Sequence, residues 1–407
     1  MKKIYKSILF GAIAAIATIF NWSCDNNNDK NTGTPYISYI RVTNQASADS
    51  LLVAGGQGQL IAIVGGNLQT VREIWLNDRQ AYFSPVYVTN TTILVNLPSE
   101  LPDVVTNQLK LIFADGYTLL HDFKLTVNPP AVNTIDCEYV AEGDSAVIHG
   151  AYFYLPITVT FPSAEGSLIN GLTVSSENGD ISVNSANNLI HVKVPAGAQP
   201  GQLIVASNFG KTASNFWFRD NRNIIQGFDS SDNPGTDGTV ISKPGAGDPP
   251  LINGKYCRIV KTMGDWAWTQ VYATWGPPYY PVPDAAILHP SDYYFKFEVC
   301  TTKPFDANGV RVWVTDPAVS NKTGPKGDGA VFYNWWPPFD SQGKWQTVSI
   351  PFEDVASALQ SWFPGGVTAD GKYFCLFVYC EAGTLQCDMS YDNFRIVPKI
   401  ILTDLGE

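Results

Sequence analysis

An internal repeat with an offset of 85 residues constrains this fold more than any other feature of the sequence. Residues 58–68 and residues 143–153 each begin with a turn glycine, continue as an alternating apolar run, and reach a second glycine seven residues later. The similarity continues downstream, where Thr92–Pro98 and Leu189–Pro195 are both alternating runs that end in proline. Repeated short strands separated by turn residues predict a tandem of small β-sandwiches.

Composition agrees with an all-β chain and excludes several classes of protein. The 407 residues include 34 Gly and 27 Pro, which disfavour long helices, and 13% aromatic residues, which disfavour disorder. The formal net charge is −11, so a phosphate backbone is an improbable partner and no nucleic-acid binding is predicted. The four histidines are scattered, which argues against a histidine-rich metal or acid–base site.

The N-terminus has the pattern of an export signal. Lys2 and Lys3 give a positively charged start, and the apolar run Ile8–Phe20 that follows is too short to span a bilayer as a helix. Cys24 comes next, with an Asp- and Asn-rich stretch after it. This pattern resembles a bacterial lipoprotein signal, which implies a signal peptide over residues 1–23, lipidation of Cys24 and a tether over residues 24–34. The acidic stretch resembles the signal that directs some lipoproteins to the outer face of the outer membrane. The alternative is an ordinary signal peptide cleaved nearby.

The other six cysteines do not form a recognisable framework. Because no two are spaced as Cys-x-x-Cys, a zinc ribbon is excluded, and most are expected to be small buried apolar side chains. A disulfide between two of the last five remains open. Asp229, Asp232 and Asp237 share one loop that could hold Ca²⁺, but such loops more often form Asx-turns. No metal or cofactor is therefore predicted.

The glycine-flanked repeat resembles the IPT/TIG immunoglobulin-like domain. The resemblance covers residues 35–128 and residues 131–220, with Asn128, Pro129 and Pro130 as a stiff linker. Neither copy shows paired carboxylates beside an aromatic cleft, so both are predicted to be spacers. A fragment of residues 221–407 is accordingly expected to keep the ligand affinity of the whole chain.

Residues 221–407 differ in composition, since they hold eight of the eleven tryptophans. Alternating runs predict strands over residues 293–300, 309–315, 345–351, 373–380 and 390–397. The run that begins at Trp345 and the terminal run that begins at Tyr391 resemble strands of jelly-roll carbohydrate-binding modules. The predicted fold class is all-β, with two tandem Ig-like (IPT/TIG) β-sandwiches followed by a larger jelly-roll-like β-sandwich.

Alternation along two of these runs separates core residues from a candidate binding surface. Val310, Val312 and Val314 share the core face of one strand, which leaves Arg311 and Trp313 on the other. In the run 265–272, Ala267, Thr269 and Val271 are predicted to face the core, and Trp266, Trp268, Gln270 and Tyr272 to face outward. Trp345, in a recurrent strand pattern, is assigned to the core.

Aromatic faces without basic clusters suit neutral sugars, because the C–H faces of a β-glucopyranose stack on indole rings while amides and guanidinium groups bind the hydroxyls. Prolines brace several of the rings in loops and would hold them rigid. The predicted glycan-binding residues are Trp266, Trp268, Gln270, Trp275, Tyr279, Tyr280, Arg311, Trp313, Asn334, Trp335, Trp336 and Trp362.

No catalytic residue is predicted, and the chain is interpreted as a non-enzyme. The Glu-x-Asp-x-x-Glu string of a jelly-roll β-glucanase is absent, and so are a nucleophile elbow and a His-Glu-x-x-His zinc motif. Glu298 shares an outward face with Lys296 and is expected to form a surface ion pair. A protein-binding adhesin is the main alternative, and a jelly-roll glycoside hydrolase is a less favoured one.

Together, a lipidated cysteine, tandem Ig-like spacers and a tryptophan-rich C-terminal sandwich resemble the surface glycan-binding proteins of starch-utilisation-like polysaccharide utilisation loci. This resemblance implies a lipid-anchored protein on the surface of the outer membrane that recruits polysaccharide for degradation and uptake. It also implies a SusD-like protein and a TonB-dependent transporter as partners. The implied ligand is a neutral β-glucan, with mixed-linkage β-glucan favoured and xyloglucan or laminarin next.

Overall fold

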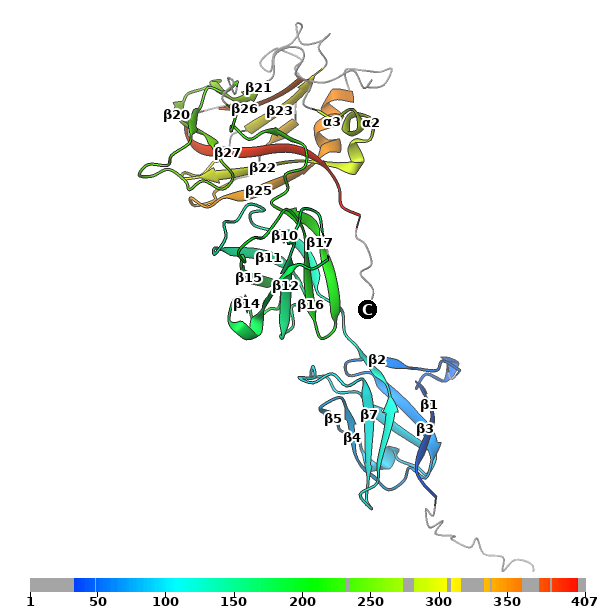
Figure 1. The fold of residues 1–407 in the computed structure, drawn as a ribbon. Helices are drawn as coiled ribbons and strands as arrows, with labels where there is room; N and C mark the ends of the chain where they lie inside the picture. Colours follow the sequence, from blue (N-terminus) through cyan, green and yellow to red (C-terminus); the bar gives the residue numbers. More distant parts are fainter. Residues whose placement is uncertain are drawn as a thin grey trace, which may run out of the picture. The chain divides into compact units, whose positions relative to one another are not determined.

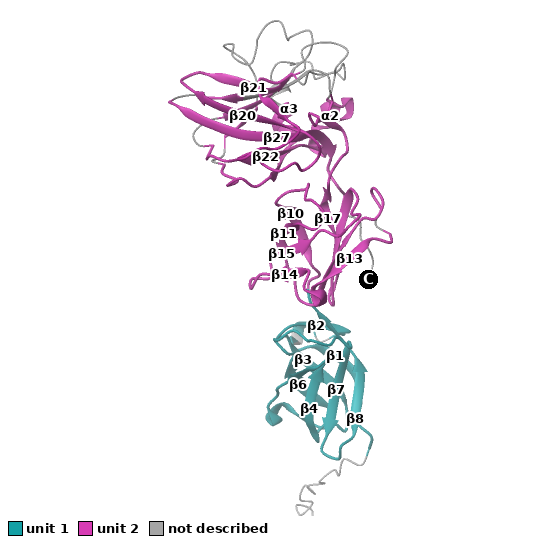
Figure 2. Ribbon diagram, turned by 60° about the vertical axis from the view of Figure 1, so that its left-hand side comes forward, with its two compact units in different colours: residues 1–127 teal, residues 128–407 magenta. Residues whose placement is uncertain are grey.

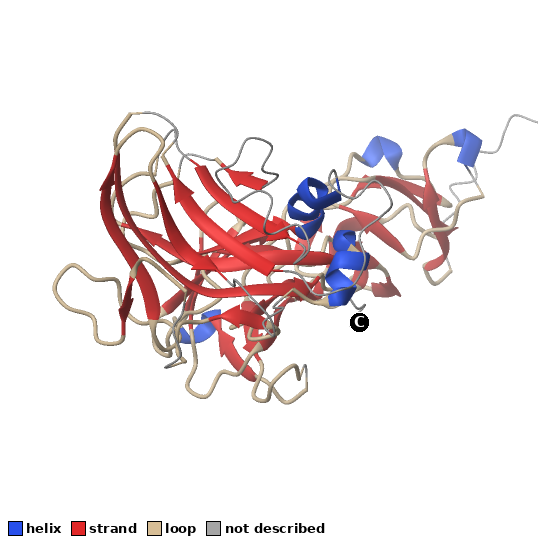
Figure 3. Cartoon of the chain, turned by 90° about the horizontal axis from the view of Figure 1, so that it is seen from above, coloured by secondary structure: helices blue, strands red, loops and turns tan. Residues whose placement is uncertain are grey.

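The computed structural model describes residues 33–47, 49–167, 169–230, 235–273, 282–305, 309–315, 333–336, 339–360, 373–380 and 383–401. The predicted signal peptide, Cys24 and most of the tether lie outside these residues. The chain forms two compact units, Met1–Val127 and Asn128–Glu407 (Figure 2). Strands dominate both units, and helices are few and short (Figure 3), so the predicted all-β class is confirmed. Within the described part, no helix has the length and apolar character needed to cross a membrane.

The first unit is a small β-sandwich around its own apolar core. Its sheets have the strand orders β1-β3-β6 and β5-β4-β7-β8, and β2 pairs with β9 in parallel. Two 3-10 turns, η1 (Gln45–Ser47) and η2 (Pro85–Tyr87), join its strands. The strands are β1 (Tyr36–Val42), β2 (Ala54–Gly56), β3 (Leu60–Gly66), β4 (Val71–Leu76), β5 (Arg79–Ala81), β6 (Thr92–Asn96), β7 (Gln108–Phe113), β8 (Thr118–Asp122) and β9 (Lys124–Thr126).

The second unit begins with another sandwich, built from the sheets β10-β11-β15-β14 and β13-β12-β16-β17. It has a separate apolar core and the turn η3 (Ser176–Asn178). Its strands are β10 (Ala131–Ile135), β11 (Ser145–Ala151), β12 (Ile157–Phe161), β13 (Leu172–Ser175), β14 (Ile181–Val183), β15 (Leu189–Lys193), β16 (Gly201–Ser207) and β17 (Gly210–Phe218).

The sequence repeat reappears as equivalent strands, because β3 and β11 have bounds that differ by 85 residues. The first glycine of each copy, Gly58 or Gly143, has a positive φ of 67° or 85° that other residues rarely adopt. The later pair, Gly65 and Gly150, lies where a Cβ would overlap a carbonyl oxygen of the sandwich's first strand. The repeat therefore encodes a turn and a close strand approach.

The rest of the second unit is a larger two-sheet sandwich (Figure 1). One sheet has the order β19-β20-β27-β22-β25, with β18 also paired to β27, and the other has the order β21-β26-β23-β24. Helix α3 (Phe352–Gln360) packs against β22 and β23, near α2 (Asp284–Leu288) and η4 (Pro290–Asp292). The strands are β18 (Ile224–Gln226), β19 (Thr239–Ile241), β20 (Tyr256–Met263), β21 (Trp268–Ala273), β22 (Tyr293–Thr301), β23 (Gly309–Thr315), β24 (Tyr333–Trp335), β25 (Gln346–Pro351), β26 (Tyr373–Tyr379) and β27 (Leu385–Pro398).

Candidate functional site

The four-stranded sheet β21-β26-β23-β24 presents one face to the core and the other away from it. Val310 and Val312 of β23 are 0% and 1% exposed, which confirms their predicted place in the core. Their partners on β26, Val378 and Leu376, are also buried there. Since side chains alternate along a strand, the intervening positions of both strands belong to the opposite face.

Strand register aligns four positions across that opposite face. Trp268 of β21 pairs with Tyr379 of β26, and Tyr379 pairs with Gly309 of β23. Val310 pairs with Trp335, so Trp336 follows opposite Gly309. The Gly309 backbone is close to the Trp336 ring, because a Cβ there would lie 3.8 Å from it. We call Trp268, Tyr379, Gly309 and Trp336 the aromatic row; at roughly 4.8 Å per strand it is about 14 Å long.

Exposed rings stand at the ends of the aromatic row. The Trp336 side chain is 42% exposed, and Trp266, just before β21, is 67% exposed with its ring edge-on to Tyr379 at 6.4 Å between centroids. Trp266 has a φ of 60°, a strained backbone conformation for a bulky residue. Trp268 is half-buried. Exposed indoles at both ends of the row, with the 9% exposed Tyr379 between them, form a stacking surface rather than a core.

Polar groups lie beside the row. The Arg311 guanidinium sits 3.5 Å from the centre of the Tyr379 ring, and its neighbour across the strands is the half-buried Asn334. Gln270 donates a hydrogen bond from Nε2 to the Gly235 carbonyl at 2.5 Å, which fixes the direction of its amide. A guanidinium and amides next to aromatic rings supply hydrogen bonds in fixed directions without a strongly charged field.

Two expectations about outward rings were wrong. Trp335 is 7% exposed and packs against Phe297 and Phe339 inside the sandwich. The reason is its register, because it pairs with the core residue Val310 and so points to the same side. Tyr272 is also buried, because the pairing of β21 with β26 shifts between Gln270 and Tyr272 and brings Tyr272 into the core.

Other predicted residues are only partly located. Trp313 lies in β23 opposite Cys375, and nothing further is described of its side chain. Trp275, Tyr279, Tyr280 and Trp362 lie outside the described residues. Sequence reasoning missed Tyr379, although the alternation of Leu376 and Val378 in the predicted strand would have placed it on the face away from the core.

A buried ionic cluster joins the second Ig-like sandwich to the C-terminal sandwich. Glu138, which follows β10, accepts a hydrogen bond from Arg395 of β27 at 2.7 Å and pairs with Lys296 of β22 at 2.5 Å. Arg395 also binds both carboxylate oxygens of Glu298 at 2.8 Å. Glu298 is 0% exposed and Lys296 is 4% exposed, so the predicted surface ion pair is wrong. We call Glu138, Lys296, Glu298 and Arg395 the junction cluster.

The junction cluster balances two carboxylates against two cations. Burial alone would lower the pKa of Arg395, but Glu298 and Glu138 raise it well above its ordinary value, so this side chain is charged in the fold. Thr347 continues the network, donating to Glu298 at 2.8 Å and accepting from the Glu138 backbone N–H at 2.8 Å. These contacts make Glu138 a structural residue of the C-terminal sandwich, although it lies in the preceding one.

Trp345 is a core residue, as its strand pattern predicts. It is 7% exposed, packs against Tyr256 with ring centroids 5.2 Å apart, and donates from Nε1 to the Pro250 carbonyl at 2.8 Å. Its cluster includes Cys137 and Tyr139 of the second Ig-like sandwich. Apolar packing therefore accompanies the ionic contacts at the junction.

The cysteines and the aspartate loop have structural roles. Cys137, Cys257, Cys300, Cys380 and Cys387 are buried free thiols, as the sequence predicts for most of them. Asp237 accepts a hydrogen bond from the Gln270 backbone N–H at 2.8 Å, and Asp229 accepts one from that of Lys255 at 2.7 Å. Among the described residues, no three potential ligands cluster around a possible metal site. Asp232 lies outside them.

Comparison with known proteins defines the class of this C-terminal sandwich. Residues 218–398 match the family described as the surface glycan-binding protein B xyloglucan binding domain. A 166-residue stretch is 31% identical to an IPT/TIG domain-containing protein of Bacteroides ovatus, covering 38% of this chain and 33% of that protein. The chain thus spans about a third of the length of this relative.

A solved structure shows the same fold over most of the chain. The surface glycan-binding protein PbSGBP-B of Prevotella bryantii superposes with a TM-score of 0.62 at 23% identity, over 90% of this chain and 99% of that one. The resemblance to surface glycan-binding proteins and the IPT/TIG assignment are confirmed. The matched domain family binds glycans, which fits a non-catalytic role for residues 218–398.

Proposed function

We propose that this chain binds a neutral β-glucan through the aromatic row without cleaving it. The observation that carries the proposal is the alignment of Trp268, Tyr379, Gly309 and Trp336 across four strands, with exposed rings at its ends. An extended glucan presents a succession of ring faces, and a line of aromatic side chains can stack on several of them. The half-buried Asn334 and Gln270 would hydrogen-bond the hydroxyls, while Arg311, which is 9% exposed and stacked on Tyr379, would hold that ring in place.

Xyloglucan and mixed-linkage β-glucan are the two ligands we propose first. The sequence favours mixed-linkage glucan on resemblance, and the match of residues 218–398 to a xyloglucan-binding family supports xyloglucan. Both are uncharged, which suits a face on which the Arg311 guanidinium is already stacked on Tyr379. Trp313 and the predicted loop residues Trp275, Tyr279, Tyr280 and Trp362 are proposed as further contacts.

Affinity electrophoresis tests the ligand class. The chain would be run in native gels containing barley β-glucan, xyloglucan, laminarin, xylan or mannan, with starch and pectin as further additives. We expect barley β-glucan or xyloglucan to retard the protein most. Retardation by starch or pectin alone would contradict the proposal, and release of reducing sugar from any of the glucans would show an enzyme instead.

We also propose that Cys24 carries the lipid that holds the protein on the outer surface of the outer membrane. There it would act beside a SusD-like protein and a TonB-dependent transporter, delivering glycan for degradation and uptake. Metabolic labelling with an alkynyl fatty acid tests the anchor. Cys24→Ala should lose the label and leave the membrane fraction, and an equally labelled Cys24→Ala variant would contradict lipidation at this residue.

A further inference from the structure

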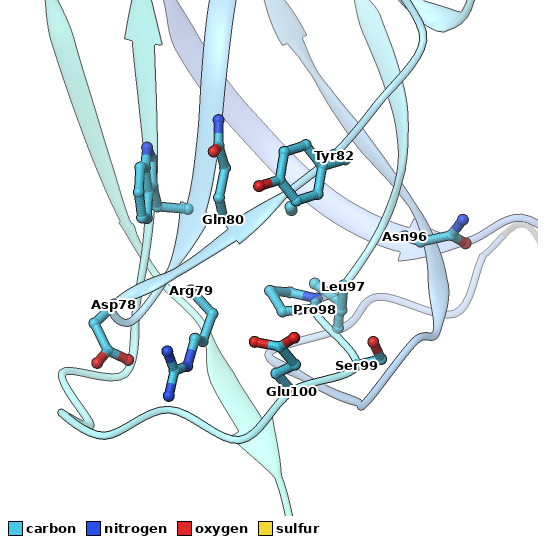
Figure 4. Close-up of a pocket in the computed structure, with 11 residues that line it drawn as sticks. Asp78, Arg79, Gln80, Tyr82, Asn96, Leu97, Pro98, Ser99 and Glu100 are labelled. Atoms are coloured by element: carbon cyan, nitrogen blue, oxygen red, sulfur yellow. The ribbon is translucent and has the colours of Figure 1, made fainter.

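The first Ig-like sandwich, predicted to be a spacer, contains a pocket of about 420 Å³. The hairpin of β4 and β5 forms one side, and the chain that follows β6 forms the other. Figure 4 shows Gln80 and Tyr82 on one side of an open space and Pro98 and Glu100 facing them. Trp75 also lines the pocket, next to Gln80 in register.

Three consecutive residues at the hairpin turn tie one wall of this pocket to the chain that follows the other wall. Asn77 Oδ1 accepts hydrogen bonds from the backbone N–H groups of Thr106 and Asn107 at 2.9 and 2.7 Å. Asp78 Oδ2 accepts from those of Asp103 and Val104, each at 3.1 Å. Arg79 donates from Nε to the Leu101 carbonyl at 2.7 Å. The hairpin side of the pocket is therefore anchored before any ligand arrives, which lowers the entropic cost of binding.

The Tyr82 ring has no role in the core. It is 81% exposed and follows Ala81, which is 2% exposed and packs inward. Trp75 is held more firmly, because its Nε1 donates to Glu73 Oε2 at 2.8 Å and Lys110 lies 5.2 Å from its ring centre. The pocket thus has one fixed indole and one phenol ring open to solvent.

The charges around the pocket select against an anionic ligand. Its lining holds the carboxylates of Asp78 and Glu100 and one guanidinium, that of Arg79, which is already paired with Asp103 at 2.9 Å. A phosphate or a uronic acid would meet a net negative field. An uncharged ligand with many hydroxyl groups fits better, because the Gln80 amide, the Asn96 amide and the Glu100 carboxylate can bind hydroxyls while Tyr82 stacks on a ring face.

We propose that this pocket is a second binding site for a neutral glycan chain, with Tyr82 as its stacking residue. This inference rests on the proposed function, since the same polysaccharide would contact both sites. Two weak contacts on one chain raise the apparent affinity for a polymer but not for an oligosaccharide that fills one site only.

The test compares a polymer with a short ligand, using the full chain. Tyr82→Ala should weaken the apparent affinity for barley β-glucan or xyloglucan in gels by about threefold to tenfold, because one stacking contact of a bivalent interaction is lost. Its affinity for a heptasaccharide of the same glucan, measured by calorimetry, should stay within twofold of the unchanged chain, since the C-terminal site is intact. Tyr87→Ala, which removes a 58% exposed ring of the same sandwich outside the pocket, is the matched control and should change neither value.

The outcomes separate the two proposals. If the unchanged chain is not retarded by any β-glucan, the proposed function fails and this site fails with it. If the unchanged chain is retarded and Tyr82→Ala is retarded equally, the proposed function stands and the second site is wrong. An equal loss for Tyr82→Ala and Tyr87→Ala would show a general effect on the sandwich and would also overturn the site.

Discussion

Two neighbouring tryptophans in the C-terminal sandwich have opposite environments. Substituting one should therefore affect stability, and substituting the other should affect binding. Trp335 is 7% exposed in the core, whereas Trp336 is 42% exposed at the end of the aromatic row. The sequence places both in one proline-braced loop, and nothing in their spacing distinguishes them. The register of β24 against β23 makes the distinction, because it sets Trp335 opposite Val310.

Substituting these two residues separately tests the assignment. Trp336→Ala should remove about 1–3 kcal/mol of binding free energy, by analogy with base stacking on aromatic rings, and leave the melting temperature unchanged. Trp335→Ala should cost about 3–5 kcal/mol of stability, because it opens a cavity against Phe297 and Phe339. Calorimetric titration and thermal melting of each variant measure both quantities. Early melting of Trp336→Ala, or normal melting of Trp335→Ala, would mean that the two faces are reversed.

The buried thiols predict a loss of stability at alkaline pH. Burial raises the pKa of Cys257 and of Cys387 from the ordinary value of 9.0 to about 12. Both pKa values are higher in the folded chain than in the unfolded one, so the free energy of unfolding keeps its full value below about pH 9. Above that pH it falls, because the unfolded chain loses the two thiol protons while the folded chain keeps them. At pH 10 each thiol should cost about 1.4 kcal/mol. The melting temperature, followed from pH 8 to 10.5, should fall less steeply in Cys257→Ala/Cys387→Ala, and equal slopes would contradict this account.

At the scale of elements, the alternation of side chains along a strand predicts many of the residues that face the core of the C-terminal sandwich. The register between paired strands decides the others. Strand patterns in the sequence correctly place Val310, Val312, Thr269 and Val271 inside the sandwich. They cannot reveal the register shift that buries Tyr272, since a bulge leaves no fixed signature in the strand itself. Alternation also cannot show that the face carrying Lys296 and Glu298 is covered by another domain, and for that reason the ion pair was predicted on the surface.

The junction cluster makes the strands β22 and β27 depend on a residue outside their own sandwich. Glu138→Ala would leave Arg395, which is 0% exposed, with one carboxylate fewer and Lys296 without its partner. We expect a loss of about 3–5 kcal/mol, the usual effect of breaking a buried ion pair. Asp180→Asn, at an exposed carboxylate of the same sandwich, is the control and should stay within about 0.5 kcal/mol. Urea denaturation gives both values, and equal midpoints for the two variants would show that the cluster contributes nothing to stability.

At the scale of the whole molecule, the repeat and the tryptophan-rich tail predict the order of the three sandwiches. The sequence does not predict which of the three sandwiches pack together as one compact unit. Residues 128–407 form one compact unit, in which the two sandwiches share the junction cluster and the packing of Trp345 near Tyr139. Contacts between residues as distant as 138 and 395 have no local signal, because each partner alone resembles an ordinary surface charge.

This coupling changes the expectation for a fragment of residues 221–407. Such a fragment lacks Glu138 and Tyr139, so it would expose Trp345 and leave Arg395 and Lys296 without a carboxylate that they share. We therefore predict that the fragment 128–407 unfolds in a single transition and binds oligosaccharide as the whole chain does. The fragment 221–407 should melt earlier, by more than the few degrees that an exposed substitution produces, and lose affinity at temperatures where it begins to unfold. Calorimetric scanning of both fragments with and without oligosaccharide measures this. Two separate transitions in 128–407, or unchanged melting of 221–407, would show that the second Ig-like sandwich is only a spacer.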